Sequence, residues 1–237
     1  MRVAALYDVH GNLPALEAVL ADLERDGGVD EIVVGGDVLW GPMQSECLSL
    51  LQNMGATFVS GNCERDVLSP DSDVDRWCNE QLGEHERASI ASWPLVVERD
   101  IDGLGPVVFC HATPHDDETI LTRITPDASV AAELAGVDTS VVICGHTHVQ
   151  YDRLVPGCLR LVNAGSVGLP YEGVAGAFWS LLGPDIELRR TAYDTEHALA
   201  RLRETGFPRF DEIFAGSLEG RVAAGEATTE FESLRGA

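Results

Sequence analysis

Short apolar runs recur along the first two thirds of the chain, and each one gives way to polar residues and glycine. The runs are rich in valine, isoleucine and other strand-forming residues, and each is too short for a helix. They predict five strands at residues 3–7, 32–34, 57–60, 107–110 and 141–144.

Helical patterns separate the earlier runs. Residues 13–25 place leucines at three- and four-residue spacing, which is typical of one buried helix face, and Asn12 is positioned to cap that helix. Residues 47–54 and 80–92 have helical character as well. Alternation of this kind predicts helices packed on sheets.

The pattern changes after Arg153. Residues 159–162, 175–182 and 186–191 predict sequential short strands, expected to be antiparallel, and a helix capped by Asp194 or Thr195 follows. The segment 220–237 has no clear periodic face. We therefore expect a single domain over residues 1–219 and a loosely held tail over residues 220–237.

Composition indicates an ordinary globular protein. The chain has 237 residues, of which 45% are hydrophobic and 23% charged, enough for one sizeable core. No apolar run approaches the roughly 18 residues of a membrane span, and the N-terminal run is too short for a signal peptide. We expect a cytoplasmic protein with no membrane partner, whose six cysteines, Cys158 among them, are mostly reduced.

The charge of the chain limits its partners. A formal net charge of −23 opposes binding to long nucleic acid or to anionic membranes, because both depend on basic residues that neutralise phosphates. An acidic protein that handles phosphate needs a local positive centre, and bound cations can supply one.

Residues able to ligate a metal follow all five early strands. In chain order these residues are Asp8, His10, Asp37, Asn62, His111, His146 and His148. Each motif alone is most simply a polar turn, but in α/β sheets the carboxyl ends of the strands share a ligand-binding crevice. Residues two apart in an extended segment point the same way, so His146 and His148 can face one pocket. Together the residues predict a metal site.

The motif series resembles that of the calcineurin-like metallophosphoesterases. It reads Asp8-Val-His-Gly-Asn, Gly35-Gly-Asp through Gly41-Pro, Gly61-Asn-Cys-Glu, a histidine after a strand, and Gly145-His-Thr-His. This resemblance implies an α/β fold, a four-layer αββα sandwich of two mixed β-sheets flanked by helices, with the metal site at the carboxyl ends of strands.

The resemblance also implies a site for two divalent ions. Asp8, His10 and His148 would hold the first ion, Asn62, His111 and His146 the second, and Asp37 would bridge the two. Carboxylate, imidazole and amide donors suit Mn²⁺, Fe²⁺, Ni²⁺ or Zn²⁺. Two ions about 3.5–4 Å apart can lower the pKa of a shared water towards ~7, giving a bridging hydroxide that attacks phosphorus.

Two positions beside the ligands are further candidates. Many relatives have histidine where this chain has Cys63, and cysteine there resembles a small prokaryotic branch active on phosphodiesters. Cys63 is therefore a candidate catalytic residue, although a packing role is an equal alternative. Arg65 is a candidate phosphate clamp, or else a surface arginine paired with one of the many acids.

These observations predict a metal-dependent hydrolase of small phosphate esters, and phosphodiesters are the substrate class that we expect it to prefer. Phosphomonoesters, phosphoproteins and dinucleotide polyphosphates are the alternative substrates. The alternative from another class is a scaffold that keeps a vestigial metal site, which seven filled ligand positions disfavour. The sequence predicts neither the natural substrate nor the oligomeric state.

Overall fold

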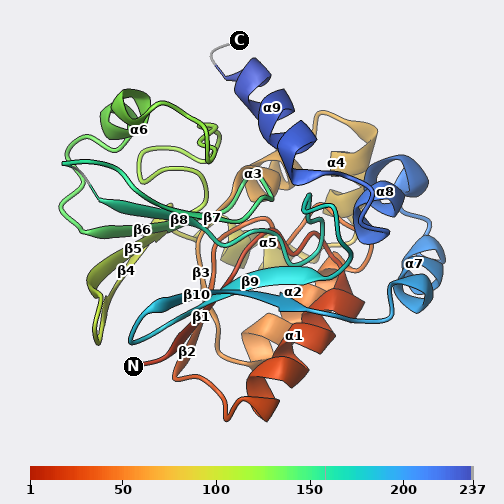
Figure 1. Cartoon of the computed structure of the whole chain (residues 1–237). Coiled ribbons are helices and arrows are strands. Elements are labelled where there is room, and N and C mark those ends of the chain that lie inside the picture. The colour runs from red at the N-terminus through yellow and green to blue at the C-terminus, as the bar shows by residue number, and fades with distance from the viewer. Residues whose placement is uncertain (158, 236–237) are drawn as a thin grey trace.

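Two β-sheets pack face to face in the computed structural model, with helices on their outer faces (Figure 1). The structure describes residues 1–157 and 159–235. Each sheet has five strands within this part of the chain, in the orders β10-β9-β1-β2-β3 and β4-β5-β6-β8-β7.

The first sheet has a parallel half and an antiparallel half. Its strands are β1 (Val3–Leu6), β2 (Glu31–Val34), β3 (Thr57–Phe58), β9 (Ala177–Leu182) and β10 (Ile186–Thr191). β1, β2 and β3 run parallel, whereas β9 is antiparallel to β1 and to β10. The antiparallel pairing expected for residues 175–182 and 186–191 is confirmed.

The second sheet is also mixed. Its strands are β4 (Val96–Ile101), β5 (Gly105–Cys110), β6 (Val141–Cys144), β7 (Tyr151–Leu154) and β8 (Arg160–Asn163). β5, β6 and β8 are parallel, while β4 and β7 pair antiparallel at the two edges.

Alternation along β1 shows how the layers form. Val3, Ala5 and Tyr7 face the second sheet, whereas Ala4 and Leu6 face the helices. The Tyr7 hydroxyl donates a 2.9 Å hydrogen bond to the carbonyl of Ile143 and so joins the two sheets. A separate apolar cluster lies between the second sheet and α6 (Asp127–Glu133). The predicted αββα sandwich is confirmed.

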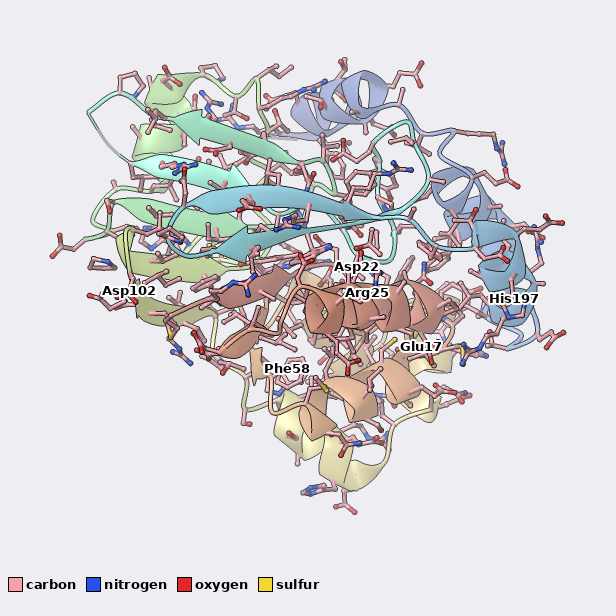
Figure 2. All side chains as sticks on the ribbon, turned by 60° about the horizontal axis from the view of Figure 1, so that its bottom comes forward. Glu17, Asp22, Arg25, Phe58, Asp102 and His197 are labelled. Carbon is pink, nitrogen blue, oxygen red and sulfur yellow. The ribbon has the colours of Figure 1, made fainter. Side chains whose placement is uncertain are left out.

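Helices α1 (Leu13–Arg25) and α2 (Gln44–Asn53) lie side by side over the first sheet (Figure 2). The side chain of Asn12 accepts from the N–H of Ala15, which confirms the predicted cap. The other helices are α3 (Asn62–Leu68), α4 (Asp73–Glu80), α5 (Glu84–Ile90), α7 (Thr195–Arg203), the π-helix η1 (Asp211–Ala215), α8 (Gly216–Leu218) and α9 (Ala224–Leu234).

Two expectations need correction. The strand expected at residues 159–162 pairs parallel with β6 in the second sheet, so it is not part of an antiparallel series with β9. The helix expected over residues 80–92 is interrupted between α4 and α5. Within the expected tail, residues 224–234 form the helix α9, which buries Ala227 and Thr228. Cys158 lies outside the described residues, as do residues 236–237.

Within the described part of the chain, no helix has both the length and the apolar composition required to cross a membrane.

Candidate metal centre

The parallel strands deliver the predicted ligands to one edge of the sandwich. β1 leads into Asp8 and His10, β2 into Asp37, and β3 into Asn62 at the start of α3. From the opposite sheet, β5 leads directly into His111, and β6 leads into the segment that carries His146 and His148. The two sheets therefore contribute ligands to the same place, as expected for carboxyl ends of parallel strands.

The backbone at these strand ends turns sharply. Asp8, His10, Asp37, His146 and His148 all have positive φ, between 44° and 65°. Side chains other than glycine rarely adopt this left-handed region, and such strained residues cluster at functional sites. Five of the seven such non-glycine residues in the described chain are predicted ligands, so the strain is concentrated at this site.

Four buried side chains form the tightest group. Ligand atoms of Asp8, His10, Asp37 and His148 all lie within 4.8 Å of one another. The two Nε2 atoms of His10 and His148 are 3.2 Å apart, and His148 Nε2 is 3.5 Å from Asp8 Oδ1. Two carboxylates and two imidazoles in this arrangement suit a divalent transition-metal ion.

A second group adjoins the first through Asp37. His111 Nε2 lies 3.1 Å from Asn62 Oδ1 and 3.5 Å from Asp37 Oδ2. The same Oδ2 atom lies 3.8 Å from His10 Nε2, in the first group. His146 flanks the second group, with its ring centroid 5.2 Å from that of His111. One carboxylate oxygen thus faces both groups.

Backbone carbonyls fix the orientation of three of the imidazoles. His148 Nδ1 bonds to the carbonyl of Leu169 at 2.7 Å, and His111 Nδ1 to that of Gly35 at 2.9 Å. His146 Nε2 lies 3.1 Å from the carbonyl of Glu118. A carbonyl can only accept, so each of these nitrogens carries the proton and leaves the opposite nitrogen free to ligate.

The charge states also fit metal binding. Burial, aided by the neighbouring His148, lowers the pKa of His10 to about 4, and burial beside His111 lowers the pKa of His146 to about 4. Both imidazoles are therefore neutral at pH 7, as ligands must be. His10 Nδ1 is buried, with no hydrogen-bond partner in the described chain. The donor set as a whole fits divalent ions.

Glu64 holds the two ligand loops together, and the sequence alone assigned it no role. Its buried carboxylate accepts hydrogen bonds from the N–H groups of Asp37 at 2.8 Å, Val38 at 2.9 Å, Leu39 at 3.1 Å and Gly61 at 2.8 Å. It thereby ties the loop after β2 to the start of α3. The only sequence signal was its place directly after Asn62-Cys63.

Cys63 lies against the predicted ligand Asp37. Its backbone N–H donates to Asp37 Oδ1 at 3.0 Å, and its side chain is buried. Burial, with the nearby charges of Asp37 and Glu64, raises the pKa of the Cys63 thiol well above its ordinary value. The side chain is thus a neutral thiol at this position; a catalytic role for it stays a prediction.

Arg65 is engaged by acidic side chains. Its guanidinium forms ion pairs with Asp117 and Glu118 and a longer one, 3.2 Å, with Asp66. Binding phosphate would require these carboxylates to be displaced. The structure places Arg65 beside the site without preparing it as a clamp, so substrate binding by this residue stays a prediction.

Tyr171 also lies next to the predicted ligands, and the sequence did not single out this tyrosine. Its ring stacks on His148 with centroids 4.8 Å apart. It lies on the long connection between β8 and β9, where no periodic pattern or motif marks a single tyrosine.

Comparisons with known proteins agree with this architecture. An uncharacterised protein of Methanocaldococcus jannaschii is 27% identical over 244 residues, which cover 90% of this chain and 98% of that protein. The crystal structure of a metallophosphoesterase from Sphaerobacter thermophilus has a TM-score of 0.72 and 29% identity, and covers 95% of this chain and 100% of that one. A hypothetical protein from Pyrococcus horikoshii OT3 has the same fold, with a TM-score of 0.78, 19% identity and coverage of 92% and 98%.

The family model of the calcineurin-like phosphoesterase superfamily domain matches residues 1–181, which include every predicted ligand. The chain therefore belongs to the calcineurin-like phosphoesterase superfamily.

Proposed function

We propose that this protein hydrolyses small phosphodiesters with the help of two divalent ions. The observation that carries the proposal is the position of Asp37 Oδ2, 3.8 Å from His10 Nε2 in one ligand group and 3.5 Å from His111 Nε2 in the other. A carboxylate oxygen shared by two ligand groups is suited to bridging two ions.

The residues divide into two ligand sets around Asp37. Asp8, His10 and His148 would hold one ion, and Asn62, His111 and His146 the other. Oxygen and imidazole donors without a thiolate favour Mn²⁺, Fe²⁺, Ni²⁺ or Zn²⁺. Ions bound there would activate a water molecule and polarise the phosphoryl oxygens.

The choice of diesters rests on what the chain places beside the ligands. The leaving group of a phosphomonoester dianion departs more readily when a neighbouring group protonates its oxygen. Cys63 is a neutral thiol, a weak hydrogen-bond donor without the positive charge of an imidazolium. A diester with a good leaving group needs less of this help.

A chromogenic assay tests the proposal. Purified protein loaded with Mn²⁺ is expected to release p-nitrophenolate from bis(p-nitrophenyl) phosphate faster than from p-nitrophenyl phosphate. Asp37→Asn should reduce that rate by more than ~100-fold, because even residues that only orient metal ligands contribute about 10- to 100-fold.

Elemental analysis separates the possible failures. Two ions per chain are expected in the wild-type protein, and fewer in Asp37→Asn. Two bound ions with no turnover of either ester would indicate a scaffold, and faster monoester turnover would identify a phosphomonoesterase. One ion per active chain would contradict the two-ion arrangement.

A further inference from the structure

Two aromatic side chains from distant parts of the sequence meet beside the ligand histidines. Tyr171 stacks on His148, with ring centroids 4.8 Å apart and an interplanar angle of 26°. Phe231 of α9 lies 6.3 Å from Tyr171 and 6.4 Å from His146, again between ring centroids. We call Tyr171 and Phe231 the aromatic pair.

The aromatic pair is held in place by contacts of its own segments. α9 is the blue helix next to the C-terminus in Figure 1. Its Glu232 accepts a 2.6 Å hydrogen bond from the Thr122 hydroxyl, and the segment before it is fixed by a 2.8 Å bond from Gly173 N–H to the Val222 carbonyl. Phe231 therefore has a defined position, as a binding surface requires.

The pair borders the accessible side of the centre. Asp8, His10, Asp37, His111 and His148 are at most 6% exposed, so a substrate cannot approach through them. In contrast, Asn62, His146, Tyr171 and Phe231 are only half-buried. A phosphate ester that approaches the predicted ligands from this side has its substituent next to the two rings.

The charges around this side favour an uncharged substituent. Asp117 and Glu118 occupy the guanidinium of Arg65. Additional phosphates on a substrate would meet carboxylates here rather than a prepared cation.

We propose that Tyr171 and Phe231 form a stacking surface for an uncharged, planar substituent of the ester. This inference rests on the proposed phosphodiesterase function and narrows its substrate class to small diesters with an aromatic or heteroaromatic group. Stacking on such rings contributes about 10-fold to binding of one planar group.

Two esters with the same leaving group test the proposal. Bis(p-nitrophenyl) phosphate and methyl p-nitrophenyl phosphate both release p-nitrophenolate, and only the first has a second planar ring. Phe231→Leu should lower the ratio of their kcat/KM values by about 10-fold relative to wild type. Intrinsic reactivity cancels in this comparison. Phe231→Tyr retains a ring and should keep the wild-type ratio.

A control variant lies on the same helix. Leu234 is 54% exposed, and Leu234→Ala should leave the ratio unchanged. An unchanged ratio in Phe231→Leu would overturn the proposal. An equal change for both esters also leaves the ratio unchanged, and it would mean that α9 only obstructs or supports the site.

Binding of inert phosphonates separates this inference from the proposed function. Calorimetry on the Mn²⁺-loaded protein should show phenylphosphonate binding weakened about 10-fold by Phe231→Leu and methylphosphonate binding unchanged. If the wild-type protein gave this result without hydrolysing either ester, the stacking surface would stand and the phosphodiesterase function would fail. Equal weakening of both phosphonates would overturn the stacking surface whatever the activity.

Discussion

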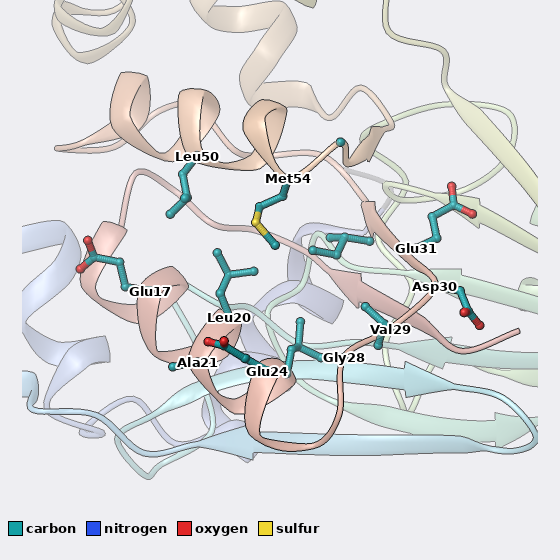
Figure 3. A pocket seen from close by; sticks show the side chains of 13 residues that line it. Glu17, Leu20, Ala21, Glu24, Gly28, Val29, Asp30, Glu31, Leu50 and Met54 are labelled. Carbon is teal, nitrogen blue, oxygen red and sulfur yellow. The ribbon is translucent and has the colours of Figure 1, made fainter.

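The two ends of strand β2 border two very different regions. At its amino end, Glu31 and Ile32 line a hollow of about 710 Å³ between α1 and α2, into which Leu20, Leu50 and Met54 point (Figure 3). At its carboxyl end, the chain passes through two glycines into Asp37 and the ligand groups.

The hollow is large, but its polar side chains do not face a common point. Glu17 binds Arg201 at 2.9 Å and Glu31 binds Arg99 at 2.7 Å, so these carboxylates are paired outside the hollow. At the other end of β2, carboxylates and imidazoles from both sheets face one another within 4.8 Å. Convergence of polar groups at strand ends, rather than cavity size, identifies the functional site.

Replacing one glycine by alanine in each region should give the largest difference, both in the free energy of unfolding and in metal affinity. A Cβ on Gly41 would lie 1.8 Å from the carbonyl oxygen of the predicted ligand His10, so Gly41→Ala must displace the peptide that carries this side chain. We expect a loss of about 3 kcal/mol in the free energy of unfolding, together with weaker metal binding. Urea denaturation of the metal-free protein and a Mn²⁺ titration measure the two effects.

Gly55 provides the comparison at the hollow. It has φ of +70°, and no atom lies within 4 Å of the position that an alanine methyl would take, so Gly55→Ala costs only backbone strain, about 1 kcal/mol. Metal affinity should be unchanged. Equal losses of stability and metal affinity in the two variants would show that the carboxyl end of β2 is no more tightly constrained than the amino end.

The sequence predicted that these side chains come together because six of the seven predicted ligands follow a buried strand, Asn62 after β3 being the exception. β1, β2, β5 and β6 each end in a run of at least three apolar residues, and a polar residue soon after such a run is conspicuous. The parallel arrangement of these strands then brings their ends together. The ligand positions thus depend on local patterns and one topological rule.

Other parts of the molecule left no such pattern. β4 and β7 are the edge strands of the second sheet, and each carries charged residues that interrupt its apolar alternation. α9 packs through the small residues Ala227 and Thr228, which give no apolar period. Glu64 and Tyr171 act through three-dimensional contacts that sequence spacing does not express.

The second comparison removes one carboxylate from each of the two regions, that of Glu64 beside the predicted ligands and that of Glu24 at the hollow. Glu64→Gln places an amide N–H₂ against backbone N–H donors that the carboxylate now satisfies, so the loops carrying Asp37 and Asn62 should lose their alignment. We expect diester turnover and Mn²⁺ affinity to fall by about 10- to 100-fold. Steady-state kinetics and a Mn²⁺ titration provide the measurements.

Glu24→Gln is the matched control, because Glu24 is exposed at the rim of the hollow. It should change neither turnover nor metal affinity. If Glu64→Gln retained wild-type Mn²⁺ affinity while the chain stayed folded, Glu64 would be a general stabiliser of the fold and not a residue that positions the ligands.

The smallest effect expected is a change in the pH dependence of metal binding. Burial lowers the pKa of His111, but the charges of Asp37 and Asp8 outweigh burial and raise it above 6.5. A proton on His111 therefore competes with the metal ion near neutral pH. The apparent Mn²⁺ affinity should rise with pH, by up to about tenfold per pH unit from this proton, and this contribution should level off above the raised pKa.

His111→Asn tests this assignment, since an amide keeps an oxygen donor but takes up no proton in this range. His10 and His146, with pKa values of about 4, contribute no such slope between about pH 5.5 and 7.5. The variant should bind Mn²⁺ more weakly, with a shallower pH dependence, whereas His197→Asn on the exposed face of α7 should match the wild type (Figure 2). An unaltered pH dependence of Mn²⁺ affinity in His111→Asn would mean that another group takes up the competing proton. The raised pKa of His111 would then not be the cause of the pH dependence.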